Sequence, residues 1–164
     1  MNTELVRLRD RAALEDLISR YALSVDARDI TAIVECFTED ARVEFNGGAA
    51  VVRGRDDLAR FFADTFESPM LGAAGVSSHL MTDGLVSLSG DTAHVETQAI
   101  ACHANDERDS VIMRGLRYAD DCERRDGEWL IGRRIHRATW EAHAPGGPFR
   151  SVAQPAGEGA GTET

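Results

Sequence analysis

The segment from residue 13 to residue 45 constrains the fold of this 164-residue chain more than any other part of it. It opens with an amphipathic helix, because apolar residues recur there at spacings of three and four. The residues of this stripe are Leu14, Leu17, Ile18, Tyr21, Ala22 and Val25. Asp26 ends the stripe one helical turn after Ala22, so its carboxylate is either solvated or buried for a purpose.

A second helix and a first strand are predicted directly afterwards. Asp29 is typical of a helix N-cap, and the apolar residues after it carry this helix through Phe37. Asp40 then turns the chain into a strand over residues 41–45. Two packed helices are therefore expected ahead of any sheet.

A hairpin and a third helix come next. Residues 46–48, Asn-Gly-Gly, form a turn signal, and residues 54–56 open a helix that ends near Pro69. The apolar face of this helix includes Phe62 and Phe66. These aromatic rings either line a ligand cavity, as substrate-binding residues, or pack against the sheet.

The remaining chain up to residue 143 reads as four long antiparallel strands, over residues 79–88, 92–104, 111–123 and 129–140. Three helices followed by such strands predict an α+β fold, a cone whose helices pack in the concave face of a curved, mainly antiparallel sheet. Residues 1–144 then form one domain. Residues 145–164, rich in glycine and proline, are predicted to be a flexible tail with a disordered end.

The turn between the first two of these strands decides what faces His79. A three-residue turn places His79 opposite Ala101 and diagonal to His103, whereas a two-residue turn places it opposite Cys102. The sequence leaves both registers open.

Composition excludes several classes of function. Apolar residues make up 43% of the chain, enough for a core, and no run approaches the roughly 20 residues of a membrane span. The net charge of −10 argues against binding to nucleic acid. All 18 basic residues are arginine, which excludes Schiff-base and pyridoxal chemistry on a lysine. No phosphate-binding glycine motif and no G-x-S-x-G motif is present.

The cysteines, the histidines and the N-terminus add three further expectations. Cys36, Cys102 and Cys122 lie far apart without a C-x-x-C, so they read as reduced, mostly buried thiols. The scattered histidines form no metal motif, so the sequence predicts catalysis without a metal or another cofactor. The N-terminus has no signal-peptide pattern, which predicts a cytoplasmic protein.

Several motifs, in this order and at these spacings, resemble the SnoaL-like branch of the NTF2-like superfamily. They are Y-x4-D at the end of the first helix, D-x7-F-x2-D-A over residues 29–41, Ser78-His79, and E-R-R-D-G-x-W over residues 123–129. The resemblance runs from Leu5 to about His143. Members of this branch include scytalone dehydratase, bile-acid 7α-dehydratase, lindane dehydrochlorinase and polyketide cyclases, so one fold serves several reactions.

The resemblance implies a catalytic pair. In the dehydratase and dehydrochlorinase members, an Asp matching Asp26 and a His matching His79 form a dyad that takes a proton from carbon. Tyr21 matches a tyrosine that helps to hold a substrate oxygen, although core packing is an equal alternative. In an ideal helix Tyr21 and Asp26 point about 140° apart, so both reach one pocket only if the helix ends or bends between them. His103 lies close to the position at which scytalone dehydratase has a second pocket histidine.

The other polar candidates are weighed from the strand pattern. Side chains alternate along a strand, so only one of Arg114 and Arg117 faces inward, where it can meet an oxyanion or a departing anion. An equal alternative is that both form surface pairs with Asp120 or Glu123. His94 and His136 are expected at the surface. The strand around Trp129, up to Arg134, is expected to be structural, with an exposed basic edge.

The sequence and the resemblance together favour a cofactor-independent lyase that acts on a small hydrophobic, oxygenated substrate of polyketide, steroid or terpenoid kind. His79 serves as general base, oriented by Asp26. A close alternative is an isomerase or cyclase that uses the same base. A non-catalytic ligand carrier or a dioxygenase small subunit is the alternative from another class.

Assembly is the last expectation from the sequence. Helices cover only the concave side of the predicted sheet, and its strands carry apolar residues on both faces, so the convex face needs a partner. Relatives bury this face in trimers or dimers, which implies a homotrimer, with a dimer as second choice.

Overall fold

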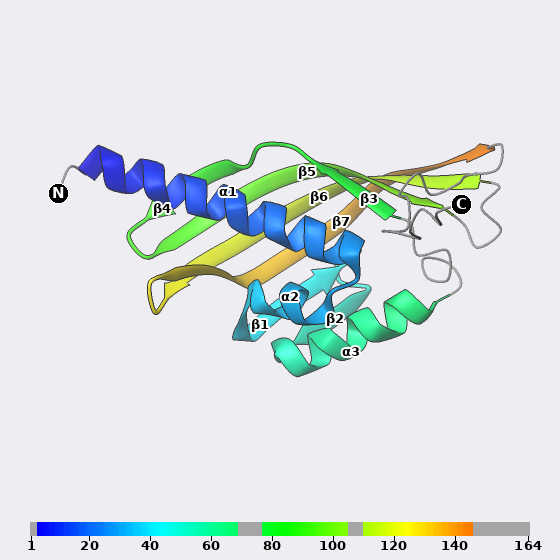
Figure 1. The fold of residues 1–164 in the computed structure, drawn as a ribbon, viewed down its shortest axis with the longest axis horizontal. Helices are drawn as coiled ribbons and strands as arrows, with labels where there is room; N and C mark the ends of the chain where they lie inside the picture. Colours follow the sequence, from blue (N-terminus) through cyan, green and yellow to red (C-terminus); the bar gives the residue numbers. More distant parts are fainter. Residues whose placement is uncertain (1–2, 69–76, 105–109, 146–164) are drawn as a thin grey trace, which may run out of the picture.

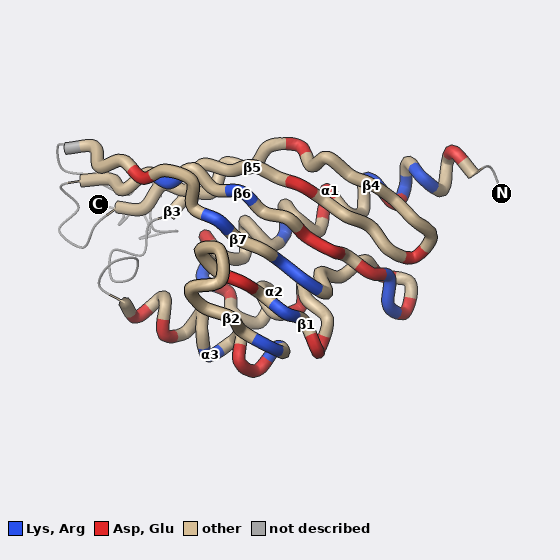
Figure 2. Tube along the Cα trace, turned by 180° about the vertical axis from the view of Figure 1, so that it is seen from behind, with Lys and Arg blue, Asp and Glu red and all other residues tan. Residues whose placement is uncertain are grey.

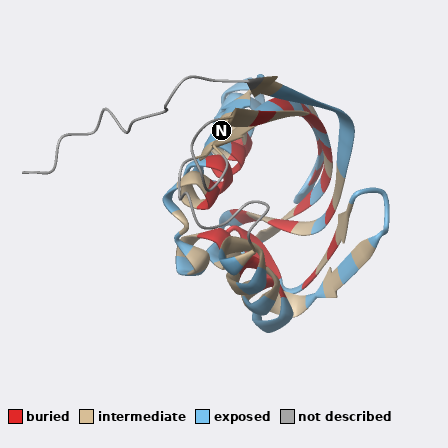
Figure 3. Cartoon of the chain, turned by 90° about the vertical axis from the view of Figure 1, so that its right-hand side faces the viewer, coloured by how far each residue is buried: buried red, intermediate tan, exposed pale blue. Residues whose placement is uncertain are grey.

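A computed structural model describes residues 3–68, 77–104 and 110–145 of the chain. The predicted α+β cone is confirmed: three helices lie on the concave side of one curved sheet, and the buried residues follow its inner surface (Figures 1 and 3). The elements are α1 (Thr3–Ala27), α2 (Ile30–Glu35), β1 (Phe37–Phe45), β2 (Ala50–Arg53), α3 (Gly54–Glu67), β3 (Ser77–Met81), β4 (Leu85–Ser89), β5 (Thr92–Ala104), β6 (Ser110–Arg125) and β7 (Glu128–Pro145). The strand order is β2-β1-β7-β6-β5-β3, with β4 also paired to β5.

Helix α1 buries the stripe that the sequence predicts. All six stripe residues are buried, and Leu14 and Leu17 are completely inaccessible. Burying one such side chain stabilises the fold by about 1.5–3 kcal/mol, which fixes the helix against the sheet. The helix continues without a break to Ala27 and ends where Arg28 adopts a φ of 57°. Asp26 therefore lies in the last turn of α1.

The second helix is shorter than predicted. Asp29 is its N-cap, as expected, and its side chain accepts a hydrogen bond from the Ala32 backbone N–H. The prediction that this helix continues through Phe37 is wrong, because Phe37 is the first residue of β1 and pairs with Ile131. The parallel pairing of β1 with β7 gives the backbone of this segment its hydrogen bonds, so the strand begins four residues earlier than expected.

The segment predicted as one strand over residues 79–88 consists of two, β3 and β4. The β4–β5 turn has two residues, since Ser89 pairs directly with Thr92. Between β3 and β4 the pairing shifts by one residue, and His79 lies opposite Ala101. Gly84 lies in this shift, where an added Cβ would come 2.8 Å from Val95. The β4–β5 turn thus has two residues, yet His79 has the partner, Ala101, that was expected for a three-residue turn.

Strand β7 has two irregularities, and each reverses the face of the sheet to which the following side chains point. The register with β6 shifts at Gly132 and again at Thr139, so each of these residues has no direct partner on β6. Arg134 consequently points inward and is completely buried, and His136 follows it on the inner face. The expectations of a basic edge reaching Arg134 and of a surface His136 are both wrong for this reason.

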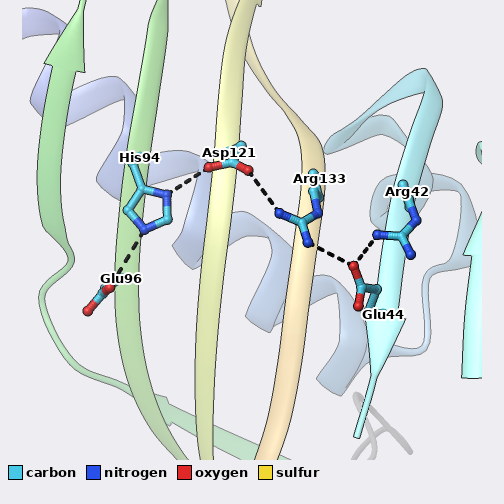
Figure 4. Close-up of polar contacts among 6 residues, drawn as sticks. All are labelled: Arg42, Glu44, His94, Glu96, Asp121 and Arg133. Carbon is cyan, nitrogen blue, oxygen red and sulfur yellow. Dashed lines mark hydrogen bonds and ion pairs between the residues drawn. The ribbon is translucent and has the colours of Figure 1, made fainter. Parts of the chain in front are cut away.

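The convex face is charged at one end. His94 on β5 lies 2.7 Å from Asp121 on β6, and Arg133 on β7 bridges Asp121 and Glu44 (Figure 4). Seen from behind, residues of both charges lie on neighbouring strands (Figure 2). His94 is half-exposed, which confirms its predicted surface position. Exposed ion pairs of this kind contribute little to stability.

Another part of the convex face, a row that crosses β3, β5, β6 and β7, is apolar. Leu80, Ile100, Gly115 and Trp140 are cross-strand neighbours in one row over β3, β5, β6 and β7. Leu80, Ile100 and Trp140 are 60%, 43% and 48% exposed. The Trp140 indole lies over Gly115, where an added Cβ would come 2.1 Å from its Nε1. No helix in the described part of the chain is long and apolar enough to cross a membrane.

Candidate functional site

A cavity of about 460 Å³ lies between α1, α3 and the inner face of the sheet. Its walls are largely aromatic, with polar groups at both ends. Phe62 and Phe66 both line it, while Phe62 also packs in the core. The other described residues that line the cavity are Tyr21, Val25, Arg28, Phe45, Asn46, Phe61, Thr65, Ser68, Ser77, His79, Ala101, His103, Arg114, Leu116, Tyr118, His136, Ala138 and Glu141.

Asp26 and His79 meet at the side of this cavity. The Nδ1 atom of His79 lies 2.7 Å from Oδ1 of Asp26. The backbone N–H of His79 donates to Oδ2 at 2.8 Å, and the Ser77 hydroxyl donates to Oδ1 at 2.8 Å. The two side chains are 8% (His79) and 21% (Asp26) exposed. Three donors therefore hold one carboxylate in place at the end of α1.

These contacts settle the charge of Asp26. Burial alone raises the pKa of its carboxyl group, but the hydrogen bonds from His79 and Ser77 outweigh that effect and hold the pKa below its usual value. Asp26 is ionised at neutral pH and accepts the proton on Nδ1 of His79. The Nε2 atom of His79 is then left as the basic nitrogen.

One row of cross-strand neighbours links His79 to a charged pair. His79 lies opposite Ala101, Ala101 opposite Arg114, and Arg114 opposite Glu141. The Arg114 guanidinium donates to Glu141 at 2.6 Å. Because Ala101 is small, space remains open between the imidazole and the guanidinium. Arg114 is thus the inward-facing arginine of β6, and Arg117 is exposed on the other face.

Two further histidines of the cavity are uncharged at neutral pH. The His103 ring lies 5.6 Å from that of His79, centroid to centroid, and burial lowers the pKa of His103 to about 4. Burial, together with the charge of Arg134, lowers the pKa of His136 to about 4 as well. His103 was expected near His79, whereas His136 was not expected here.

Tyr21 lies over a buried ion pair. Arg134 and Asp120 are joined by two hydrogen bonds of 2.7 Å, and both side chains are completely buried. The Arg134 guanidinium lies 3.9 Å from the Tyr21 ring and 4.7 Å from the Tyr118 ring. Burial raises the pKa of Tyr21 although Arg134 opposes it, so its hydroxyl remains protonated. Tyr21 packs in the core and also lines the cavity. Asp26 does not line the cavity itself but contacts His79, which does. Both residues therefore belong to one site although α1 does not bend between them.

Tyr118 and His136 line the cavity but were not predicted to do so, although the sequence contains an indication for each. Tyr118 has the same parity along its strand as Arg114 and Leu116, so an inward Arg114 implies an inward Tyr118. For His136 the only hint is Gly132, since a glycine inside a strand often marks a bulge.

Cys36 and Cys122 are buried and Cys102 is half-buried, and all three are free thiols. Within the described ranges, no group of three or more His, Cys, Asp or Glu side chains is placed to hold a metal ion.

The curved sheet with three helices on its concave side defines the class of fold, an α+β cone, and comparison with known proteins identifies the family. A family model described as "SnoaL-like domain" matches residues 6–135, so the chain belongs to the SnoaL-like family. An uncharacterised protein of Mycobacterium tuberculosis, Rv2910c, is 26% identical over 136 residues, which cover 80% of this chain and 86% of that protein.

Two solved structures share the fold. A hexachlorocyclohexane dehydrochlorinase, LinA type 2, superposes with a TM-score of 0.78 at 23% identity, over 93% of this chain and 100% of that one. A putative scytalone dehydratase from Novosphingobium aromaticivorans superposes with a TM-score of 0.70 at 21% identity, over 97% and 99% of the two chains. At these identities the likeness establishes the fold alone.

Replacing His136 with phenylalanine is expected to reduce the loss of stability in acid. The pKa of His136 is about 4 in the folded protein and near 6.5 when unfolded, so the unfolded chain binds the extra proton between these values. The wild type therefore loses stability as the pH falls from 6.5 to 4, by on the order of 2 kcal/mol from this residue. Urea unfolding at pH 7, 5.5 and 4.5 measures the effect. A difference between variant and wild type that does not grow toward low pH would contradict it.

Proposed function

We propose that this protein is a cofactor-independent lyase that eliminates water or another small leaving group from a hydrophobic, oxygenated substrate. The observation that carries the proposal is the 2.7 Å contact between Asp26 and His79 beside an aromatic cavity. A base with a fixed tautomer, facing a site enclosed by apolar side chains, is suited to removing a proton from carbon.

The chemistry follows from the groups around the cavity. The Nε2 atom of His79 takes the proton, the electrons of the broken C–H bond form a carbon–carbon double bond, and the leaving group departs with its bonding pair. Asp26 stabilises the imidazolium that forms. Arg114, across Ala101, is the cation nearest in the same row, and it stabilises an oxyanion or a departing anion. His103, neutral and adjacent to His79, contacts the substrate near the reacting carbon.

Product analysis by mass spectrometry tests this function. The purified protein is incubated with hexachlorocyclohexane, with scytalone and with a panel of oxygenated two- and three-ring compounds. A lyase gives products lighter by HCl or by water. Products of unchanged mass would instead indicate the isomerase or cyclase that the same base allows. Saturable binding with no product at all would favour a ligand carrier.

We also propose that the apolar row on the convex face is buried in a homotrimer, with a dimer as second choice. Three exposed apolar side chains, Leu80, Ile100 and Trp140, lie together there beside a charged region. Closed symmetry brings the same row of each copy to one interface.

Light scattering at micromolar concentration is expected to give the mass of three 17.8 kDa chains. Ile100→Asp should lower that mass to one chain, because it introduces a charge into the apolar contact. Leu23→Asp is the control, since Leu23 is also an exposed apolar residue, 69% exposed against 43% for Ile100, but lies on α1. A wild-type mass of one chain would reject the assembly, and a mass of two would favour the dimer.

A further inference from the structure

The cavity is built in three layers along the strands. The first layer is charged and contains His79, Arg114 and Glu141, with Ala101 between them. The second layer is apolar and consists of the cross-strand neighbours Leu116 and Ala138. The third layer contains Tyr118 and His136, which are also direct neighbours. Tyr118 is four positions after Arg114, so the first and third layers lie about 13 Å apart along β6.

The third layer is polar but carries no net charge that a ligand can reach. Tyr118 is 3% exposed, and burial raises the pKa of its hydroxyl group, which keeps it protonated. The low pKa of His136 keeps that ring neutral. The positive charge of Arg134 behind Tyr118 is balanced by Asp120. This end of the cavity therefore suits an uncharged oxygen rather than a carboxylate.

The Tyr118 hydroxyl has no hydrogen-bond partner among the described residues. Its ring packs against Tyr21 and His136, with centroids 6.3 Å and 5.3 Å away, but it forms no hydrogen bond among the described residues. In the same part of the chain, Nδ1 of His136 is buried without a hydrogen bond. Both residues line the cavity, so an oxygen atom of a ligand can form the hydrogen bonds that these two groups do not make with the described residues.

We propose that the substrate spans all three layers and carries a second, uncharged oxygen that binds the Tyr118 hydroxyl beside His136. The substrate class is then an elongated compound of two or three rings. Its reacting carbon lies by His79, its apolar middle lies on Leu116 and Ala138, and a hydroxyl or carbonyl group lies at the far end. The position of the reacting end rests on the proposed function, whereas the far end is defined by the third layer alone.

Binding of two matched probes tests the far end without any turnover. The probes are 2-naphthol and naphthalene, which differ by one hydroxyl group, and their intrinsic fluorescence reports binding. The wild type is expected to bind 2-naphthol about tenfold more tightly, as one hydrogen bond of about 1 kcal/mol or slightly more predicts. Tyr118→Phe should reduce this preference to within about twofold. Removing an unpaired hydroxyl should also leave the melting temperature unchanged or raise it.

Three further variants complete the test. Arg117→Gln is the matched control, because Arg117 is the neighbour of Tyr118 on β6 with its side chain on the outer face, and it should keep the tenfold preference. His79→Ala should also keep it, since the hydroxyl binds at the other end. His136→Leu should weaken the preference about threefold and provides a second readout if Tyr118→Phe does not fold.

The outcomes separate this inference from the proposed function. A preference that survives in Tyr118→Phe, or that disappears in His79→Ala, would overturn the inference, as would failure of 2-naphthol to bind at all. Loss of the preference in Tyr118→Phe alone would support it. That result would stand even if no eliminated product were found, and in that case only the assignment of a lyase would fail.

Discussion

Replacing His79 with glutamine is expected to lower kcat by about 10³- to 10⁴-fold with little change in KM, once a substrate is identified by its eliminated product. Glutamine has a similar reach but cannot take a proton from carbon. The Nε2 atom of His79 is the basic nitrogen in the cavity that is held in one tautomer, through the 2.7 Å contact of Nδ1 with Asp26. Steady-state kinetics at pH 7 measure the loss.

The chain contains a matched control for this experiment. His94 lies 2.7 Å from Asp121, the same Nδ1–Oδ1 distance as in the inner pair, but on the convex face (Figure 4). His94→Gln should therefore leave kcat within about twofold, because an exposed pair contributes little to stability and His94 does not line the cavity that contains His79. Circular dichroism shows whether each variant is folded. Unchanged turnover in His79→Gln would reject His79 as the base.

Replacing Asp120 with asparagine is expected to lower the free energy of unfolding by about 3–5 kcal/mol, the largest effect on stability that we expect from one substitution. Arg134 and Asp120 are both completely buried and joined by two hydrogen bonds of 2.7 Å. Without the carboxylate, a guanidinium remains charged among the rings of Tyr21, Tyr118 and Phe37. Urea unfolding at pH 7 measures the change.

The double variant Asp120→Leu with Arg134→Met separates the cost of an unpaired charge from the value of the pair. Replacing both partners by apolar groups removes two buried charges at once, so most of the lost stability should return. An exposed pair, Arg11 with Glu15, is the control: Glu15→Gln should change the free energy of unfolding by less than about 0.5 kcal/mol. A small effect of Asp120→Asn would mean that water reaches Arg134.

Local patterns in the sequence were sufficient for the elements that depend on near neighbours. The stripe from Leu14 to Val25 is buried as predicted, and the cap at Asp29 is in place. The hairpin at residues 46–48 and the start of α3 at Gly54 also agree, because turn and helix signals act over a few residues. The family motifs named Asp26 and His79, and the structure brings these two side chains into contact.

The tertiary structure alone decided which way the side chains of β7 point and what faces His79. One extra residue in a strand reverses every following side chain, and whether it is accommodated depends on the pairing with the neighbouring strand. The shift at Gly132 turns Arg134 and His136 inward, against the alternation that begins at Trp129, and the shift at Thr139 turns Trp140 outward again. The shift between β3 and β4 sets His79 opposite Ala101 in the same way. Local sequence patterns determined most of the helices and turns, but pairing across the sheet determined where β1 begins, where β3 and β4 separate, and which side chains line the cavity.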